Sequence, residues 1–253
     1  MKKIAIAVAF VAVTVIAFWI GRQSEQAPAP TVDSGPPPIA AAPTAIASPD
    51  GPNVGGAPPA ESASSDAVFR AYKCPDSNAD KCEYMLGAAT SAAEAQWLER
   101  MGYPTAAQTE EFSKMPLSEL KRLSDAKNNV ATVFYGKKLV EAGQGLIGLG
   151  VMQQAAVRGS IYANHVMAEA LLDKNSGVSD PIEGKARLRL AYLLGDWKAS
   201  YPLSSSLAGS AAPLEVGIVD RRAMRLYEGL LSAKYREHVP VVFAVRPTSP
   251  DPL

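Results

Sequence analysis

The residues that could carry out chemistry are few and scattered along the chain. His165 precedes Glu169 by four residues, so on a helix their side chains share one face. This spacing favours a surface histidine hydrogen-bonded to that carboxylate, and leaves open a general base or a pH-responsive contact. No nucleophile can be assigned to it. Glu141 or Glu169 could act as the single acid of a glycan hydrolase.

Sequence motifs for cofactors, phosphates and metals are absent. The stretch GQGLIGLG from Gly143 resembles a phosphate cradle only superficially, because no strand precedes it, and glycine is common at turns between helices. Ser204–Ser206 lacks the G-x-S-x-G context of a nucleophile. We therefore expect no cofactor and no metal site. The 25 basic and 25 acidic residues cancel, which argues against nucleic-acid binding.

The only cysteines are Cys74 and Cys82, separated by the turn-forming segment Pro75–Asn78. In an exported protein such a pair is normally a disulfide. Closing a nine-residue loop would stabilise the fold by about 2.5 kcal/mol. A metal site would need more ligands, and a redox pair usually has C-x-x-C spacing.

The start of the chain predicts that the protein is exported. Lys2 and Lys3 precede an uncharged run from Ile4 to Gly21, which as a helix spans roughly 27 Å. We predict a signal anchor over residues 1–23, with a single pass through a bacterial inner membrane and the remainder in the periplasm. Cleavage and secretion is the alternative, with Ala27–Ala29 as the only nearby candidate site.

Residues 24–65 are rich in proline, alanine, glycine and serine and have few large apolar side chains. Such a segment cannot offset its ordering entropy, so we predict a disordered linker that extends to about 130 Å at most, with a proline-rich docking motif as the alternative. From residue 66 to residue 238 the pattern is helical, with a disulfide-stapled N-terminal cap. A helix is expected over Ala92–Met101, and another after Pro116.

Three windows of this domain can be overlaid without gaps: residues 121–140, 153–172 and 189–208. Each contains a helix break, and the second residue of each break is a favoured N-cap type. The pattern predicts a helix, a tight turn and a second helix, repeated. The alternative is an irregular alanine-rich bundle whose register is accidental. The coinciding residues are Asn128, Ser160 and Asp196; Ala131, Ala163 and Ala199; Tyr135, Met167 and Leu203; and Leu139, Leu171 and Leu207.

The motif Ala131-x3-Tyr135-Gly136-x2-Leu139 resembles the first helix of a SEL-like repeat, a tetratricopeptide-like unit. Ala155-Ala156-x2-Gly159-x3-Ala163 and Ala191-Tyr192-x2-Gly195-x3-Ala199 resemble the junction between units. The resemblance covers roughly residues 117–209. Two departures from the family pattern are the lack of an evident glycine-rich loop with aspartate, and Pro202, which we expect to kink its helix.

The resemblance implies an all-α fold, a short right-handed solenoid of helix pairs that acts as a scaffold for other proteins. In that geometry the first helices line the concave face, so Lys137, His165, Glu169 and Tyr201 are the expected binding residues.

Residues Leu214–Glu237 predict a longer closing helix with an apolar face. Its charged face favours a solvated cap, and a basic docking surface is the alternative. Val241–Val245 is a short β-prone run in an extended tail, residues 239–253, that could pack back onto the helices. The apolar face comprises Val219, Ala223, Leu226, Leu230 and Ala233, and the charged face includes Arg221, Arg222, Arg225 and Lys234.

Three functions follow from these features. The first is a membrane-tethered periplasmic scaffold that binds a protein or peptide partner. The second is a cell-envelope enzyme, such as the helical glycan hydrolase with a single catalytic glutamate. The third is a structural or assembly role through self-association of the anchor. No small-molecule substrate is identified, and we expect a binding protein rather than an enzyme.

Overall fold

The computed structural model describes residues 61–74, 81–82, 84–208, 213–242 and 244–248. This described part is all-helical: it contains ten α-helices, the short 3-10 helix η2 (Trp197–Ala199) and no β-strand, so the predicted all-α class is confirmed. None of its helices is both long and apolar enough to cross a membrane. The predicted anchor, residues 1–23, and all but the last residues of the predicted linker lie outside the described residues.

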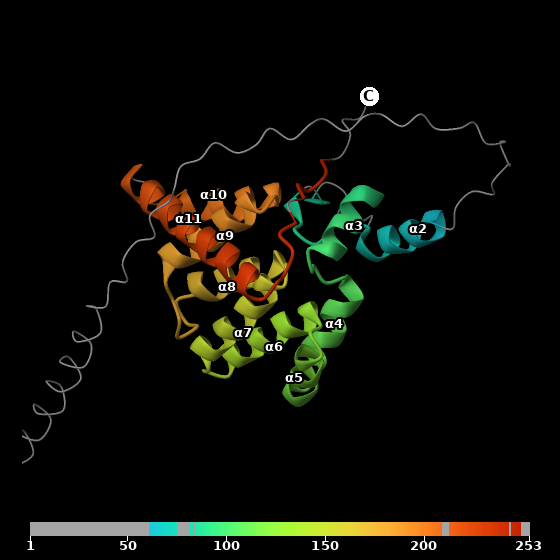
Figure 1. The fold of residues 1–253 in the computed structure, drawn as a ribbon, viewed down its shortest axis with the longest axis horizontal. Helices are drawn as coiled ribbons and strands as arrows, with labels where there is room; N and C mark the ends of the chain where they lie inside the picture. Colours follow the sequence, from blue (N-terminus) through green and yellow to red (C-terminus); the bar gives the residue numbers. More distant parts are fainter. Residues whose placement is uncertain (1–60, 75–80, 83, 209–212, 243, 249–253) are drawn as a thin grey trace, which may run out of the picture. The chain divides into compact units, whose positions relative to one another are not determined.

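Helices α5 to α11 lie side by side, largely in chain order, with α2, α3 and α4 along one side of them (Figure 1). The most extensive contacts are between α6 and α7, α8 and α9, and α9 and α11. The helices are α2 (Glu61–Tyr72), α3 (Ala92–Arg100), α4 (Ala106–Lys114), α5 (Leu117–Asp125), α6 (Asn129–Glu141), α7 (Gly145–Val157), α8 (Tyr162–Leu172), α9 (Pro181–Leu193), η2 (Trp197–Ala199), α10 (Ser200–Leu207) and α11 (Pro213–Arg236).

The boundary of the predicted linker is wrong at its end. Helix α2 begins at Glu61, within the segment predicted to be disordered. The last turn of α2 is held by contacts with the rest of the helical domain: the Tyr72 hydroxyl donates to the Tyr103 carbonyl at 2.7 Å, and Val68 and Phe69 pack on the core around Trp97. Contacts of the apolar residues after position 65 thus stabilise a helix whose first residues have the composition of the predicted linker.

The predicted register of helix breaks is confirmed. At the three equivalent positions Lys127, Gly159 and Gly195 the backbone is left-handed, with φ of 64°, 108° and 106°. In each turn two backbone N–H groups bond back to the end of the preceding helix. The following residue then caps the next helix through its side chain, as Asn128 does for α6 and Asp196 for η2.

The alanines at the equivalent positions of the repeat lie in the interior of the fold. Ala131, Ala163 and Ala199 are all fully buried. The third unit departs from the pattern, because a 3-10 turn precedes α10. Pro202 lies in the first turn of α10, where no helical partner is required for its missing N–H. The expectation that Pro202 kinks a helix is therefore wrong.

We had expected the glycines of the GQGLIGLG stretch to lie in a turn between helices, but those after Gly143 lie in α7. Only Gly143 lies in the turn, with φ of 78°. Gly148 lies inside α7 against Gly136 of α6, and a Cβ on Gly148 would sit 2.5 Å from the Gly136 carbonyl oxygen. The absence of both side chains lets the two helices pack backbone to backbone.

The closing helix is confirmed as α11, with Val219, Ala223 and Leu230 buried. Lys234, predicted on its charged face, is instead buried at 7% exposure. The predicted β-prone run forms no strand in its described residues. We call residues 239–248 the C-terminal arm. The Trp97 indole donates to the Ala244 carbonyl at 2.7 Å, and the Arg246 amide donates to Gly195 at 2.9 Å, so the arm is fixed to α3 and the α9–η2 turn.

Candidate functional site

Helices α6 and α8, each the first helix of a helix pair, line a cavity of about 540 Å³ together with the turn that follows α8. Its apolar surface comes from Val140, Val166 and Ala170. Its charged surface is mostly acidic, with Glu141 and Glu169 beside Asp173, against the single cation Lys137. A side chain that is both long and basic matches this combination of walls.

A second cavity of about 290 Å³ adjoins the first between α4, α6 and α8. The two cavities share Lys137, Glu141 and Val166 as lining residues. The second is lined in addition by the aromatic rings of Phe134 and Tyr162. We call the two together the groove.

An ion pair bridges the two main walls of the groove. The Lys137 ammonium lies 3.1 Å from a carboxylate oxygen of Glu169, and the side chains are 41% and 66% exposed. At this exposure the pair is worth little to stability, on the order of 0–1 kcal/mol. Both groups remain accessible, so they can exchange this bond for one with a ligand.

The structure brings together two of the four predicted binding residues. Lys137 and Glu169 line the groove, while Tyr201 packs its ring against Tyr84 and Trp197 on other elements. The structure corrects the predicted environment of His165. We expected a surface histidine bonded to Glu169, but its side chain is 4% exposed and its Nε2 lies 2.8 Å from Asp196. His165 faces inward to the α9–η2 turn, whereas Glu169 is exposed and pairs with Lys137, so the predicted bond between the two is wrong.

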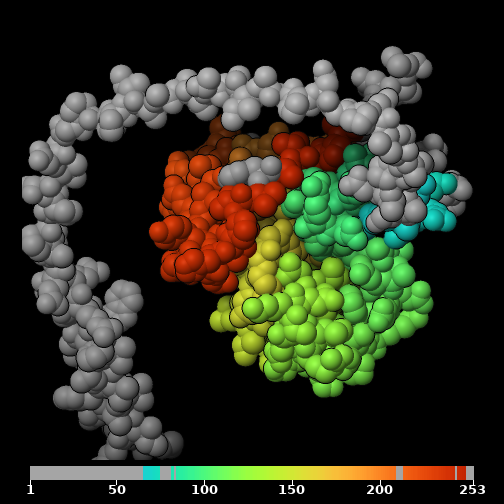
Figure 2. All heavy atoms as spheres, turned by 45° about the vertical axis from the view of Figure 1, so that its right-hand side comes forward, coloured from blue at the N-terminus to red at the C-terminus, as the bar shows by residue number. Residues whose placement is uncertain are grey.

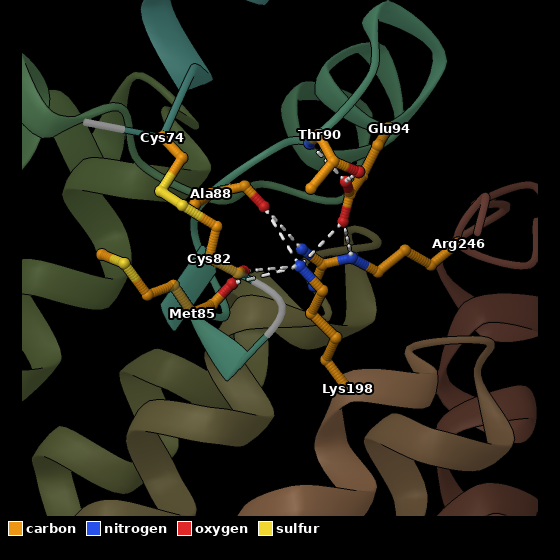
Figure 3. Close-up of a disulfide and its surroundings, with 8 residues drawn as sticks. All are labelled: Cys74, Cys82, Met85, Ala88, Thr90, Glu94, Lys198 and Arg246. Atoms are coloured by element: carbon orange, nitrogen blue, oxygen red, sulfur yellow. Dashed lines mark hydrogen bonds and ion pairs between the residues drawn. A yellow bond between two sulfur atoms is a disulfide. The ribbon is translucent and has the colours of Figure 1, made fainter. Parts of the chain in front are cut away.

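A buried charge network lies where the arm meets α3 and η2. Glu94, Lys198 and Arg246 are each at most 1% exposed. One oxygen of Glu94 accepts from Arg246 Nε at 2.8 Å and lies 3.0 Å from Lys198 Nζ, and the other accepts from the amide and hydroxyl of Thr90 (Figure 3). Arg246 also donates to the Ala88 carbonyl at 3.1 Å.

Asp196 forms the second half of this network. Its Oδ2 accepts from the Tyr103 hydroxyl and pairs with His165, and its Oδ1 accepts from Arg246 at 3.1 Å and from the Lys198 amide at 3.2 Å. Arg246 thus connects Asp196 to Glu94 and also stacks over Trp97, 5.4 Å from the ring centroid. One arginine of the arm satisfies two buried carboxylates.

The electrostatics of the network maintain the ionised state of both acids. Burial alone would raise the pKa of Glu94, but the Thr90 amide with Arg246 and Lys198 holds it below the usual value. For Asp196 burial is likewise overcome, by His165 and Arg246, so its pKa is also lowered. Burial lowers the pKa of Lys198. The charges compensate one another, as in a structural network that orients the arm.

The disulfide supports the same network from the other side. Cys74 and Cys82 are bonded, with 5.9 Å between their Cα atoms, which confirms the predicted pairing. Lys198 Nζ donates to the carbonyl of Cys82 at 3.3 Å, and also to those of Met85 and Ala88 (Figure 3). Cys82 and the residues that follow the disulfide therefore surround this buried ammonium with carbonyl oxygens.

Across the described residues, no group of three or more histidine, cysteine, aspartate or glutamate side chains is placed to hold a metal ion. Sequence reasoning missed Val166, Ala170 and Asp173 of the groove. A signal was present for the first two: they follow Tyr162 at four-residue spacing and so share its face of α8. For Arg246 no local signal existed.

No protein-family model, curated protein or solved structure matches the chain.

Proposed function

We propose that this protein is a membrane-tethered periplasmic scaffold whose groove binds a protein or peptide partner. The observation that carries the proposal is the groove itself, formed by the two first helices, α6 and α8, of the repeated units. The proposal includes the anchor at residues 1–23, the linker and the stacking of the helix pairs as a SEL-like right-handed solenoid. Its support is the hydropathy of the start of the chain and the repeated turn geometry.

The chemistry of the groove suggests an extended or helical peptide with alternating basic and apolar side chains. Apolar residues of such a peptide would contact Phe134, Val166 and Ala170. A lysine or arginine would replace Lys137 as the partner of Glu169, or pair with Glu141 or Asp173. Charged groups of this kind contribute specificity more than affinity.

A peptide-library selection against the full-length protein tests the proposal. In Ala170→Arg, a long cation fills the larger cavity from a helical position that tolerates arginine. The matched control, Gln154→Arg, adds the same charge to an exposed position of α7. We expect selected peptides to bind the wild type and the control equally, and Ala170→Arg at least about tenfold more weakly. Equal binding to all three would refute the groove as the site.

A cell-envelope glycan hydrolase is the second candidate, because Glu141 and Glu169 both line the larger cavity. The pairing of Glu169 with Lys137 and the exposure of its side chain do not provide the apolar burial that makes a carboxylic acid a proton donor at neutral pH. Glu141→Gln and Glu169→Gln, assayed for release of soluble fragments from purified peptidoglycan, decide this. Wild-type release abolished by one of them would favour the enzyme.

A further inference from the structure

A cavity separate from the groove lies where three helices end. The last residues of α3, the end of α7 with its turn, and α11 surround it, and the arm residues Val239–Val242 close one side. Its volume is about 330 Å³, within the range of small-molecule sites. In Figure 2 the red residues of α11 and the arm lie beside the green of α3, with the yellow of the α7–α8 turn between them. It shares no lining residue with the groove.

Most of the wall of this cavity is apolar. The side chains come from four separate parts of the chain, so the cavity exists only when the arm is in place. A ligand that buries a hydrocarbon body here would gain on the order of 25 cal/mol for each Å² removed from water. The apolar lining consists of Met101, Ala156, Ile161, Leu194, Leu230, Val239, Pro240 and Val242.

The charged residues of the wall are all cationic: Arg100, Arg158 and Lys234, with no carboxylate among the lining residues. Cations are favourable beside the carbonyl ends of helices, which accounts for their presence at these positions. The guanidinium of Arg158 is also held by Asn129 at 2.8 Å and Thr132 at 2.9 Å.

The Lys234 ammonium is different, because it is buried and forms no ion pair with a carboxylate among the residues that the structure describes. The residue is 7% exposed, and its Nζ donates to the Pro240 carbonyl at 3.5 Å, the outer limit of a hydrogen bond. Burial lowers the pKa of Lys234. Gly159, another lining residue, places no side chain against Nζ, whereas a Cβ at this position would lie 3.8 Å from it.

We propose that this cavity is a binding site for a small amphipathic carboxylate, with the carboxylate on Lys234 Nζ and the hydrocarbon body against the apolar wall. Arg100 and Arg158 reinforce the positive potential at the head group. A neutral ligand of the same shape would leave the ammonium with the long bond to Pro240 and no anionic partner. A small hydrophilic anion would leave the apolar wall without contact.

The probe we choose is 4-phenylbutyrate, with the neutral 4-phenylbutyramide as its matched control, measured by saturation-transfer NMR on the full-length protein. All proteins are compared in one detergent, and each affinity is calculated from the free probe concentration, because the anion and the neutral amide partition differently into micelles. We expect saturable binding of the carboxylate, at least about tenfold tighter than of the amide, because a charge-assisted bond is lost. Equal binding of both probes, or no saturable binding at millimolar concentration, would overturn the proposal.

Two sets of variants locate the site. Lys234→Met retains the apolar stem and removes the ammonium, and we expect it to weaken 4-phenylbutyrate binding at least about tenfold. Val242→Asp adds a carboxylate to the wall and should also weaken binding, whereas Val245→Asp, on the exposed arm outside the cavity lining, should not. If Lys234→Met fails to fold, the Val242 and Val245 pair decides alone, and identical affinities in that pair refute the assignment.

Discussion

Arg246→Met should destabilise the protein more than any other single change in the arm. The substitution keeps a long apolar side chain over Trp97 but removes the cation that connects Glu94 with Asp196. Breaking a buried pair by removing one partner costs about 3–5 kcal/mol, because an uncompensated charge stays buried. Here Lys198 still pairs with Glu94, and His165 and Tyr103 still contact Asp196, so we expect about 3 kcal/mol.

The assay is urea unfolding of the full-length chain at pH 7, followed by far-UV circular dichroism. Arg236→Met is the matched control, since Arg236 is exposed on α11, and it should change the free energy of unfolding by less than about 0.5 kcal/mol. Arg246→Lys should fall between the two, because an ammonium lacks the planar fork that reaches both carboxylates. A loss below about 1 kcal/mol in Arg246→Met would refute the view that the arm is held by this network.

Three further predictions address other parts of the fold. Replacing both Cys74 and Cys82 with serine should lower the free energy of unfolding by about 2.5 kcal/mol in urea titrations, and an unchanged midpoint would contradict the stapling role. Gly148→Ala should lower the free energy of unfolding by about 1–3 kcal/mol, because its Cβ would meet the Gly136 carbonyl, whereas Gly150→Ala in the same helix faces open space and should stabilise the protein by up to about 1 kcal/mol. Thermal unfolding compares the two variants, and equal effects would contradict the close packing of α6 on α7. Because the pKa values of Glu94 and Asp196 are lowered, the stability that these ionised carboxylates contribute is complete above their ordinary pKa values of 4.5 and 3.8 and is lost as pH falls through the lowered values. The wild type should therefore lose stability below about pH 4.5, and Arg246→Met should lose less; parallel acid titrations of the two proteins would refute this.

The sequence predicted the parts of the fold whose causes are local. The turn at Gly195–Asp196 could be predicted because a left-handed residue followed by a capping side chain is a short-range demand of the backbone. The buried alanines followed from their period. The disulfide followed from the presence of only two cysteines and a turn between them.

The rest depended on contacts between residues far apart in sequence. Arg246 pairs with Glu94 across 152 positions, and nothing in a proline-flanked tail distinguishes this arginine from an exposed one. His165 was misplaced for the same reason: a helical face can be predicted from spacing, but which neighbour covers it depends on packing. Lys137 and Glu169 were expected on one surface because the SEL-like resemblance places the first helices there, but their ion pair across 32 positions was not predicted.

Photocrosslinking in cells tests the central claim, that the groove holds a protein partner, most directly. A photoreactive benzoylphenylalanine would replace Glu169 in the groove of the full-length protein, and Gln154 on the exposed face of α7 in a matched strain. We expect a discrete protein adduct from the Glu169 position that is absent from the Gln154 position and disappears when Ala170→Arg is added. Identical adduct patterns from both positions, or none from the groove, would contradict the account.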